Sequence, residues 1–109
     1  MVAAVSLMAM GPENRRLVEL MQSVNFGRIE GLVVRDGGPV FNPRPRVVRE
    51  IKFGAENGPR PETARIDFSL KTEVRELFAQ LEALGNAVVG CIEVKHGLPF
   101  RMTVVEGDA

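Results

Sequence analysis

The chain has 109 residues and a mass of 12.0 kDa, which suits one domain with a single modest hydrophobic core. Apolar residues make up 45% of the chain and charged residues 26%, which is ordinary for a globular chain and argues against an intrinsically disordered protein. The 14 basic and 14 acidic residues cancel, so no overall charge attracts the chain to nucleic acid or to an anionic membrane. No apolar run approaches the roughly 18 residues that cross a bilayer, so we expect no membrane partner.

The first ten residues and the single cysteine bear on the compartment. The segment 1–10 (MVAAVSLMAM) is apolar but lacks the basic residues that open a signal peptide. The alternatives are a tail, an extra strand or an extension upstream of a true start at Met10, and a tail is the default expectation. Cys91 is the only cysteine, which excludes an internal disulfide and a zinc site made of several cysteines. Both observations favour a reducing, cytoplasmic setting.

The first predicted element is a helix from Glu13 to Asn25, introduced by Gly11-Pro12. Its apolar residues recur at helical spacing and form one stripe. Gly27 is suited to the left-handed exit from the helix. The residues of the stripe are Leu17, Val18, Leu20, Met21 and Val24.

A β-hairpin is predicted next. The strand over 28–35 contains Leu32 and Val34 in alternation, but Ile29 is out of phase with them. A glycine inside a strand often marks a bulge, so we place one at Gly31. Asp36-Gly37 is the strongest short hairpin signal, because a type I′ turn needs positive φ at both central residues. The return strand ends near residue 41 and contains a proline, which indicates an edge strand.

The stretch from residue 42 to residue 70 alternates between extended and irregular patterns. Two prolines make 42–46 stiff and extended, and the alternation over 47–53 predicts a strand. Residues 54–65 are rich in glycine and proline and predict a surface loop. A short strand over 66–70 follows.

The second half of the chain predicts a helix and another hairpin. Ser69 or Thr72 is a candidate cap for a helix that ends at Leu84, before Gly85-Asn86. Strands over 88–95 and 98–105 close the chain around a His96-Gly97 turn. The alternation of the last strand places four apolar side chains on one face: Leu98, Phe100, Met102 and Val104.

A shift of 60 residues superimposes the two predicted helix-and-hairpin segments without a gap. Five residues coincide with identical ones: Glu13, Leu17, Val34, Gly37 and Pro39 fall on Glu73, Leu77, Val94, Gly97 and Pro99. Either the chain is a duplicated αββ unit, or two elements of similar length happen to match. In both cases we predict one α+β domain over 1–109, with two αββ units (about 12–53 and 66–106) joined by a loop over 54–65. The units form a four- to five-stranded antiparallel sheet with two helices packed on one face.

The first unit also resembles a known family. Phe26-Gly27, the run 33–37 (VVRDG) and the run 49–53 (REIKF) are similar to the pattern of the YezD-like family of small bacterial proteins. The similar region extends from Leu17 to Phe53 and departs by one extra residue near Gly31 and by the proline-rich segment 42–45. The resemblance implies a helix followed by a hairpin, and a fold rather than an activity.

Catalytic residue patterns are sparse. Cys91 and His96 are five residues apart on one strand, roughly 16 Å at about 3.3 Å per residue, which is too far for a nucleophile and its base. We interpret His96 as a turn residue and Cys91 as a small apolar strand residue. The glycine spacing of a phosphate-binding loop is missing, and we expect no cofactor and no metal. The sequence therefore predicts a protein that is not an enzyme.

Two functional hypotheses follow. The first is a small interaction module that self-associates through an exposed sheet edge or helix face, or binds another protein. The second is a nucleic-acid-binding accessory protein, because the segment 44–65 is locally basic and arginine suits phosphate contact. The candidate anion contacts are Arg44, Arg46, Arg49, Lys52, Arg60 and Arg65.

Overall fold

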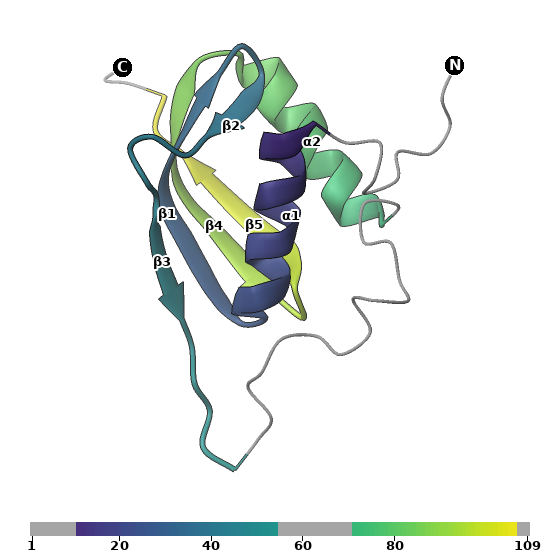
Figure 1. Ribbon diagram of the computed structural model, residues 1–109, viewed down its shortest axis with the longest axis vertical. Helices are drawn as coiled ribbons and strands as arrows, with labels where there is room; N and C mark the ends of the chain where they lie inside the picture. Colours follow the sequence, from purple (N-terminus) through teal and green to yellow (C-terminus); the bar gives the residue numbers. More distant parts are fainter. Residues whose placement is uncertain (1–10, 55–70, 107–109) are drawn as a thin grey trace.

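The computed structural model describes residues 11–54 and 71–106, which form two helices and a five-stranded antiparallel sheet (Figure 1). The α+β class is therefore as predicted. The predicted strand over 66–70 and the candidate cap Ser69 lie outside the described residues. In chain order the elements are α1 (Pro12–Val24), β1 (Gly27–Arg35), β2 (Gly38–Val40), β3 (Arg46–Arg49), α2 (Thr72–Leu84), β4 (Ala87–Lys95) and β5 (Leu98–Val104).

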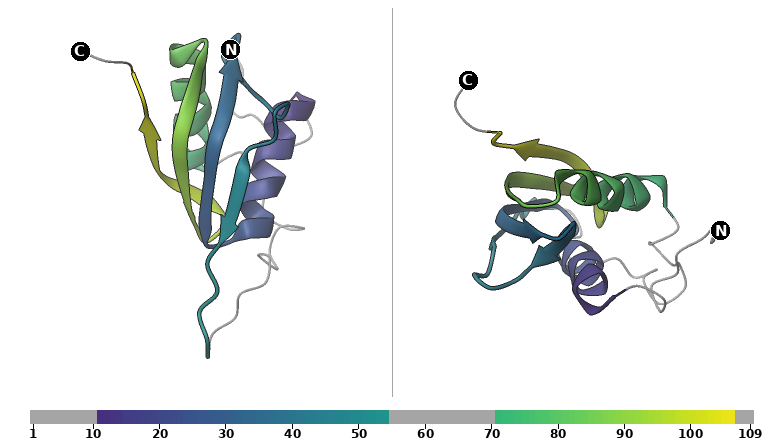
Figure 2. Two further views of the ribbon diagram at one scale, coloured as in Figure 1. Left: turned by 90° about the vertical axis from the view of Figure 1, so that its left-hand side faces the viewer. Right: turned by 90° about the horizontal axis from the view of Figure 1, so that it is seen from above.

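The sheet is organised around its two central strands. The strand order is β2-β1-β4-β5, and β3 also pairs with β1. In the central pair, Gly27 lies opposite Val94 and Val34 lies opposite Ala87, so β1 and β4 run antiparallel along their whole length. Both helices lie on the same face of this sheet (Figure 2), as predicted. Neither of the two described helices lies on the other face.

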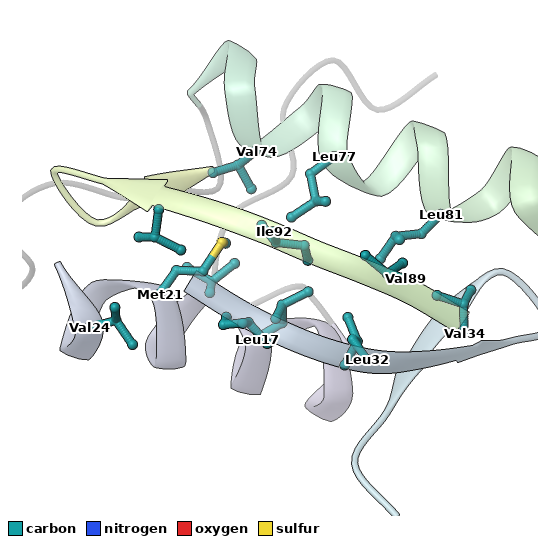
Figure 3. Close-up of a cluster of buried hydrophobic side chains, with 13 residues drawn as sticks. Leu17, Met21, Val24, Leu32, Val34, Val74, Leu77, Leu81, Val89 and Ile92 are labelled. Atoms are coloured by element: carbon teal, nitrogen blue, oxygen red, sulfur yellow. The ribbon is translucent and has the colours of Figure 1, made fainter. Parts of the chain in front are cut away.

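The hydrophobic core fills the layer between the helices and the sheet (Figure 3). The apolar stripe predicted for α1 faces this core, and α2 adds Val74, Leu77 and Leu81. Burying each aliphatic side chain contributes about 1.5–3 kcal/mol relative to leaving it in water. The buried side chains are Leu17, Val18, Met21, Val24, Ile29, Leu32, Val34, Val74, Leu77, Leu81, Val89, Ile92 and Val94.

Gly31 changes which way the side chains of β1 point. Its φ is +73°, and Ile29 and Leu32 on either side are both fully buried although they are three residues apart. The pairing with β4 continues unshifted, since Leu32 lies opposite Val89. The strand is therefore irregular at Gly31, where the sequence predicted a bulge. It is not a bulge against β4, because no extra residue is inserted into that pairing.

Both hairpin turns have the backbone that the sequence predicted. Asp36 and Gly37 have φ of +52° and +79°, and His96 and Gly97 have φ of +56° and +74°. Positive φ at both central residues is the requirement of a type I′ turn, whose twist matches that of the strands. The interpretation of His96 as a turn residue is confirmed.

Each hairpin turn is tied to the end of the helix in the other half of the chain. The N–H of Gly37 donates to the carbonyl of Gly85 at 2.8 Å, and the N–H of Gly97 donates to the carbonyl of Asn25 at 2.9 Å. Asn25 and Gly85 are the residues that follow α1 and α2, and both have positive φ. The bounds of α1 and α2 differ by 60 residues at each end, as do those of β1 and β4. The two hydrogen bonds are thus equivalent at the 60-residue offset.

Strand β3 is shorter at its end than the sequence predicted. It ends at Arg49, not at residue 53, because Glu50 makes the last backbone contact, to the carbonyl of Phe26. Beyond it Phe53 is 96% exposed. Ile29 and Val89 are equivalent positions of β1 and β4 at the 60-residue offset. Val47 of β3 lies opposite Ile29, and Val104 of β5 lies opposite Val89. Strand β3 therefore pairs with the part of β1 that corresponds to the part of β4 paired with the end of β5. Strand β3 therefore belongs to the repeated arrangement.

Two local predictions in the second half were wrong. Thr72 is the first residue of α2, not its cap; the cap position is Lys71, without a side-chain hydrogen bond. Phe100 does not share the buried face of β5, because the pairing with β4 shifts between Glu93 and Val94. The Phe100 ring is 53% exposed and lies 4.0 Å from the Lys95 ammonium.

Candidate interaction surface

The sheet face opposite the helices is the candidate site, and we call it the open face. No described helix or loop covers it. Ile29, Leu32 and Val34 point into the core, so the residues that alternate with them point the other way, together with their cross-strand neighbours. These open-face residues are Arg28, Glu30, Val33, Val40, Arg46, Val48, Val88, Cys91, Glu93, Arg101 and Thr103.

One half of the open face is charged. Arg28 Nε donates to Glu30 Oε2 at 2.6 Å, and Arg46 Nε lies 3.5 Å from Glu30 Oε1. On the β4 side, Arg101 Nη1 lies 3.8 Å from Glu93 Oε2. The hydrogen bond from Arg28 holds the pKa of Glu30 below its usual value and raises the pKa of Arg28. The charged half therefore presents both signs, already partly paired within one chain.

The other half of the open face is apolar. Val33 on β1 lies directly opposite Val88 on β4 and Val40 on β2. Val88 is 55% exposed although it is on a central strand, and Val105 beyond β5 is 72% exposed. A Val105 methyl lies close to Gly90, between the two halves. These four valines (Val33, Val40, Val88 and Val105) are here called the valine cluster.

Cys91 and His96 do not form a catalytic arrangement. Cys91 lies on the open face opposite Glu30, and its partial burial raises the pKa of the thiol, which favours the unreactive protonated form. The His96 ring packs edge-on against Phe26, with 4.8 Å between ring centroids. Within residues 11–54 and 71–106, no three histidine, cysteine, aspartate or glutamate side chains are grouped in a way that could hold a metal ion.

The basic residues proposed to contact nucleic acid are divided between two places. Arg46 lies beside Glu30 on the open face. Arg44 instead lines a shallow groove between α1 and the segment before β3, together with Phe41 and Val47. Arg49 ends β3 and Lys52 follows it, whereas Arg60 and Arg65 lie outside the described residues.

The sequence did not single out the residues that define the open face. Alternation shows which residues of a strand share a face but not which strands are neighbours. The pattern therefore predicts only strand positions for Arg28, Val33, Val88 and Glu93. The antiparallel pairing of β1 with β4 is what places them together. One signal in the sequence is a pair of adjacent valines such as Val88-Val89, because two successive apolar residues in a strand place one of them on the face away from the core.

Comparisons with protein-family models, with curated proteins and with solved structures found no match to this chain. The open face is therefore interpreted from its own geometry. Among the described residues, neither helix is long and apolar enough to cross a membrane.

Proposed function

We propose that this protein is a non-enzymatic interaction module that self-associates through the open face of its sheet. The observation that carries the proposal is the exposure of Val88, at 55%, on a central strand. A central strand that carries an exposed valine beside other valines leaves an apolar patch, and such patches mark interaction sites. The self-associating surface is thus the open face of the sheet, not a sheet edge or a helix face.

The energetic argument favours a second copy of the same chain. Covering apolar surface contributes about 25 cal/mol per Å², whereas association costs several kcal/mol of lost freedom, about 4–15 by most estimates. In a two-fold symmetric dimer each contact occurs twice, so the valine cluster contributes twice over. The presence of both signs of charge on the open face also avoids the repulsion that a face of one sign would meet.

We also propose that the chain arose by duplication of one αββ unit. The 60-residue offset between the helix bounds and the equivalent hydrogen bonds of Gly37 and Gly97 support this origin. The resemblance of 17–53 to the YezD-like family remains a prediction.

Nucleic-acid binding through the basic segment is the competing function. Arg46 contacts the Glu30 carboxylate on the open face, whereas Arg44 lines the groove beside α1, so these two arginines do not form one basic patch. If that function were correct, mobility-shift titrations would show binding that weakens with salt and with Arg44→Ala plus Arg46→Ala. We expect no binding at low salt, and a salt-sensitive shift would favour the competing function.

Light scattering of the full chain at micromolar concentration tests the proposal. We expect a mass of twice 12.0 kDa, and a stable 12.0 kDa species would overturn the proposal. Val88→Lys should return the chain to a monomer, because a lysine in the valine cluster would be buried without a partner. Val47→Lys is the matched control: Val47 is an exposed strand valine, 44% accessible, in the groove on the helix side. The control variant should remain dimeric.

A further inference from the structure

We infer that two copies pack their open faces together about a two-fold axis that runs parallel to the strands, between β1 and β4. This inference rests on the proposed self-association and specifies its geometry. It assigns a partner to each of four central residues: Arg28 faces Glu93 of the partner subunit, and Val33 faces Val88 of the partner subunit.

The pairing register of the central strands leads to this arrangement. Arg28 on β1 lies opposite Glu93 on β4, and Val33 on β1 lies opposite Val88 on β4. A two-fold axis between these strands, parallel to them, exchanges the positions of β1 and β4 across the interface. Each Arg28 is then above a Glu93 and each Val33 above a Val88. The open face is therefore complementary to itself in charge and in hydrophobicity.

The alternative face-to-face axis is unfavourable. An axis across the strands would reverse the charged half and the apolar half, so Arg28 would face the partner's Val33 and Glu93 the partner's Val88. Charged groups would then lose water against apolar side chains without gaining an opposite charge, which costs several kcal/mol per ion. Of the two axes, only the one along the strands places valine against valine in the apolar half and arginine against glutamate in the charged half.

The backbone at the middle of the face suits close packing. Gly31 and Gly90 lie between the charged and apolar halves, and a Cβ placed on Gly31 would meet no atom within 4 Å. Packed sheets lie about 10 Å apart with strand directions within roughly 30° of each other. At that crossing angle the central strands remain opposed, while the outer strands diverge. The assignment is accordingly confined to residues of β1 and β4.

Charge-reversal variants test the assignment in trans. Arg28→Glu brings a carboxylate against the partner's Glu93, and Glu93→Arg brings two guanidinium groups together, so each variant alone should dimerise about tenfold or more weakly. A mixture of the two variants restores both pairs, because each carboxylate then faces a guanidinium group. We expect the mixed dimer to form with an affinity near that of the unchanged protein. If Arg28 and Glu93 acted only on each other within one chain, mixing the two variants would not restore dimerisation.

Two controls make the outcomes distinct. Arg75→Glu, an exposed charge reversal on α2, should leave dimerisation unchanged. Thermal melts show whether each variant is folded, which matters because Arg28→Glu adds a second carboxylate near Glu30. A monomeric unchanged protein would overturn the proposed function itself. A dimeric unchanged protein whose folded variants fail to restore each other would overturn only the inferred axis.

A second measurement does not depend on charge. In a Cys91→Ser background, Val33→Cys and Val88→Cys are prepared as separate proteins, mixed and oxidised. We expect a disulfide to form between residue 33 of one chain and residue 88 of the other, and mass spectrometry identifies it. It should form faster than the 33–33 or 88–88 disulfides that each protein can form when oxidised by itself. Faster 33–33 or 88–88 links in the separate proteins would contradict the axis.

Discussion

Gly27, the first residue of β1, is the most demanding position for a side chain among the glycines described. A Cβ added there would lie 2.0 Å from the Val48 carbonyl oxygen and 2.9 Å from the Cα of Arg49. Both atoms belong to the backbone of β3, so a rotamer change cannot relieve the overlap. Gly27→Ala therefore forces β3 away from β1 or disrupts their pairing.

The magnitude follows from the two possible responses. Overpacking that shifts backbone costs about 1–3 kcal/mol, and lost pairing at Gly27–Arg49 adds to it. We expect a loss of about 3 kcal/mol in the free energy of unfolding. For a domain of this size each kcal/mol lowers the melting temperature by about 4–8 °C, so the variant should melt roughly 12–24 °C below the unchanged protein.

Gly31→Ala is the matched control, with both substitutions made in the monomeric Val88→Lys protein so that the dimer interface beside Gly31 does not contribute. Its φ of +73° is unfavourable for alanine, but a Cβ there meets no atom within 4 Å. The strain of about 1–2 kcal/mol is partly offset by the smaller entropy of the unfolded alanine chain, which leaves a loss of about 1 kcal/mol. Circular dichroism during thermal and urea unfolding measures both variants. A Gly27→Ala variant as stable as Gly31→Ala would refute the reasoning.

Three further changes give independent checks. Gly97→Val should lower the melting temperature by several degrees, since a β-branched residue is strained at positive φ and the N–H bonded to Asn25 is displaced; an unchanged melt would contradict the turn assignment. Glu30→Gln tests the carboxylate held by Arg28: because the folded pKa of Glu30 is lowered, its contribution is present at pH 7 and is lost as pH falls through that value. The melting difference between Glu30→Gln and the unchanged protein should therefore shrink below about pH 4, and a constant difference would argue against the pair. Iodoacetamide should alkylate Cys91 more slowly in the folded protein than in urea at pH 8, because its thiol pKa is raised; equal rates would show a thiol unaffected by the fold.

Local features of the fold were the most predictable from the sequence. Helix α1 follows from its apolar spacing, and the turn at Asp36-Gly37 follows from the need for positive φ at two successive residues. The irregular backbone at Gly31 was also predictable, because Ile29 is out of phase with Leu32. Each of these features depends on residues that are near one another in the chain.

Features that depend on distant residues were not predictable. Strand β3 ends at Arg49 because β1 begins at Gly27 and offers no further partner, although the alternation continues to Phe53. Phe100 leaves the buried face because of a register shift against β4, which the pattern of β5 alone does not contain. The open face has the same origin, since it exists only once β1 and β4 are neighbours.

The central pairing of β1 with β4 also has a consequence for synthesis. Position 30 in β1 lies opposite position 91 in β4, so the first strand is complete about 60 residues before its neighbour leaves the ribosome. At roughly 5–20 residues per second that interval is about 3–12 s, during which one edge of β1 is unpaired. Because β1 and β4 bury side chains at the same three positions along the strand, a second nascent chain presents a similar strand to that edge. Crowding of such chains on one message would favour pairing between chains, and slow synthesis of the second half would increase that hazard.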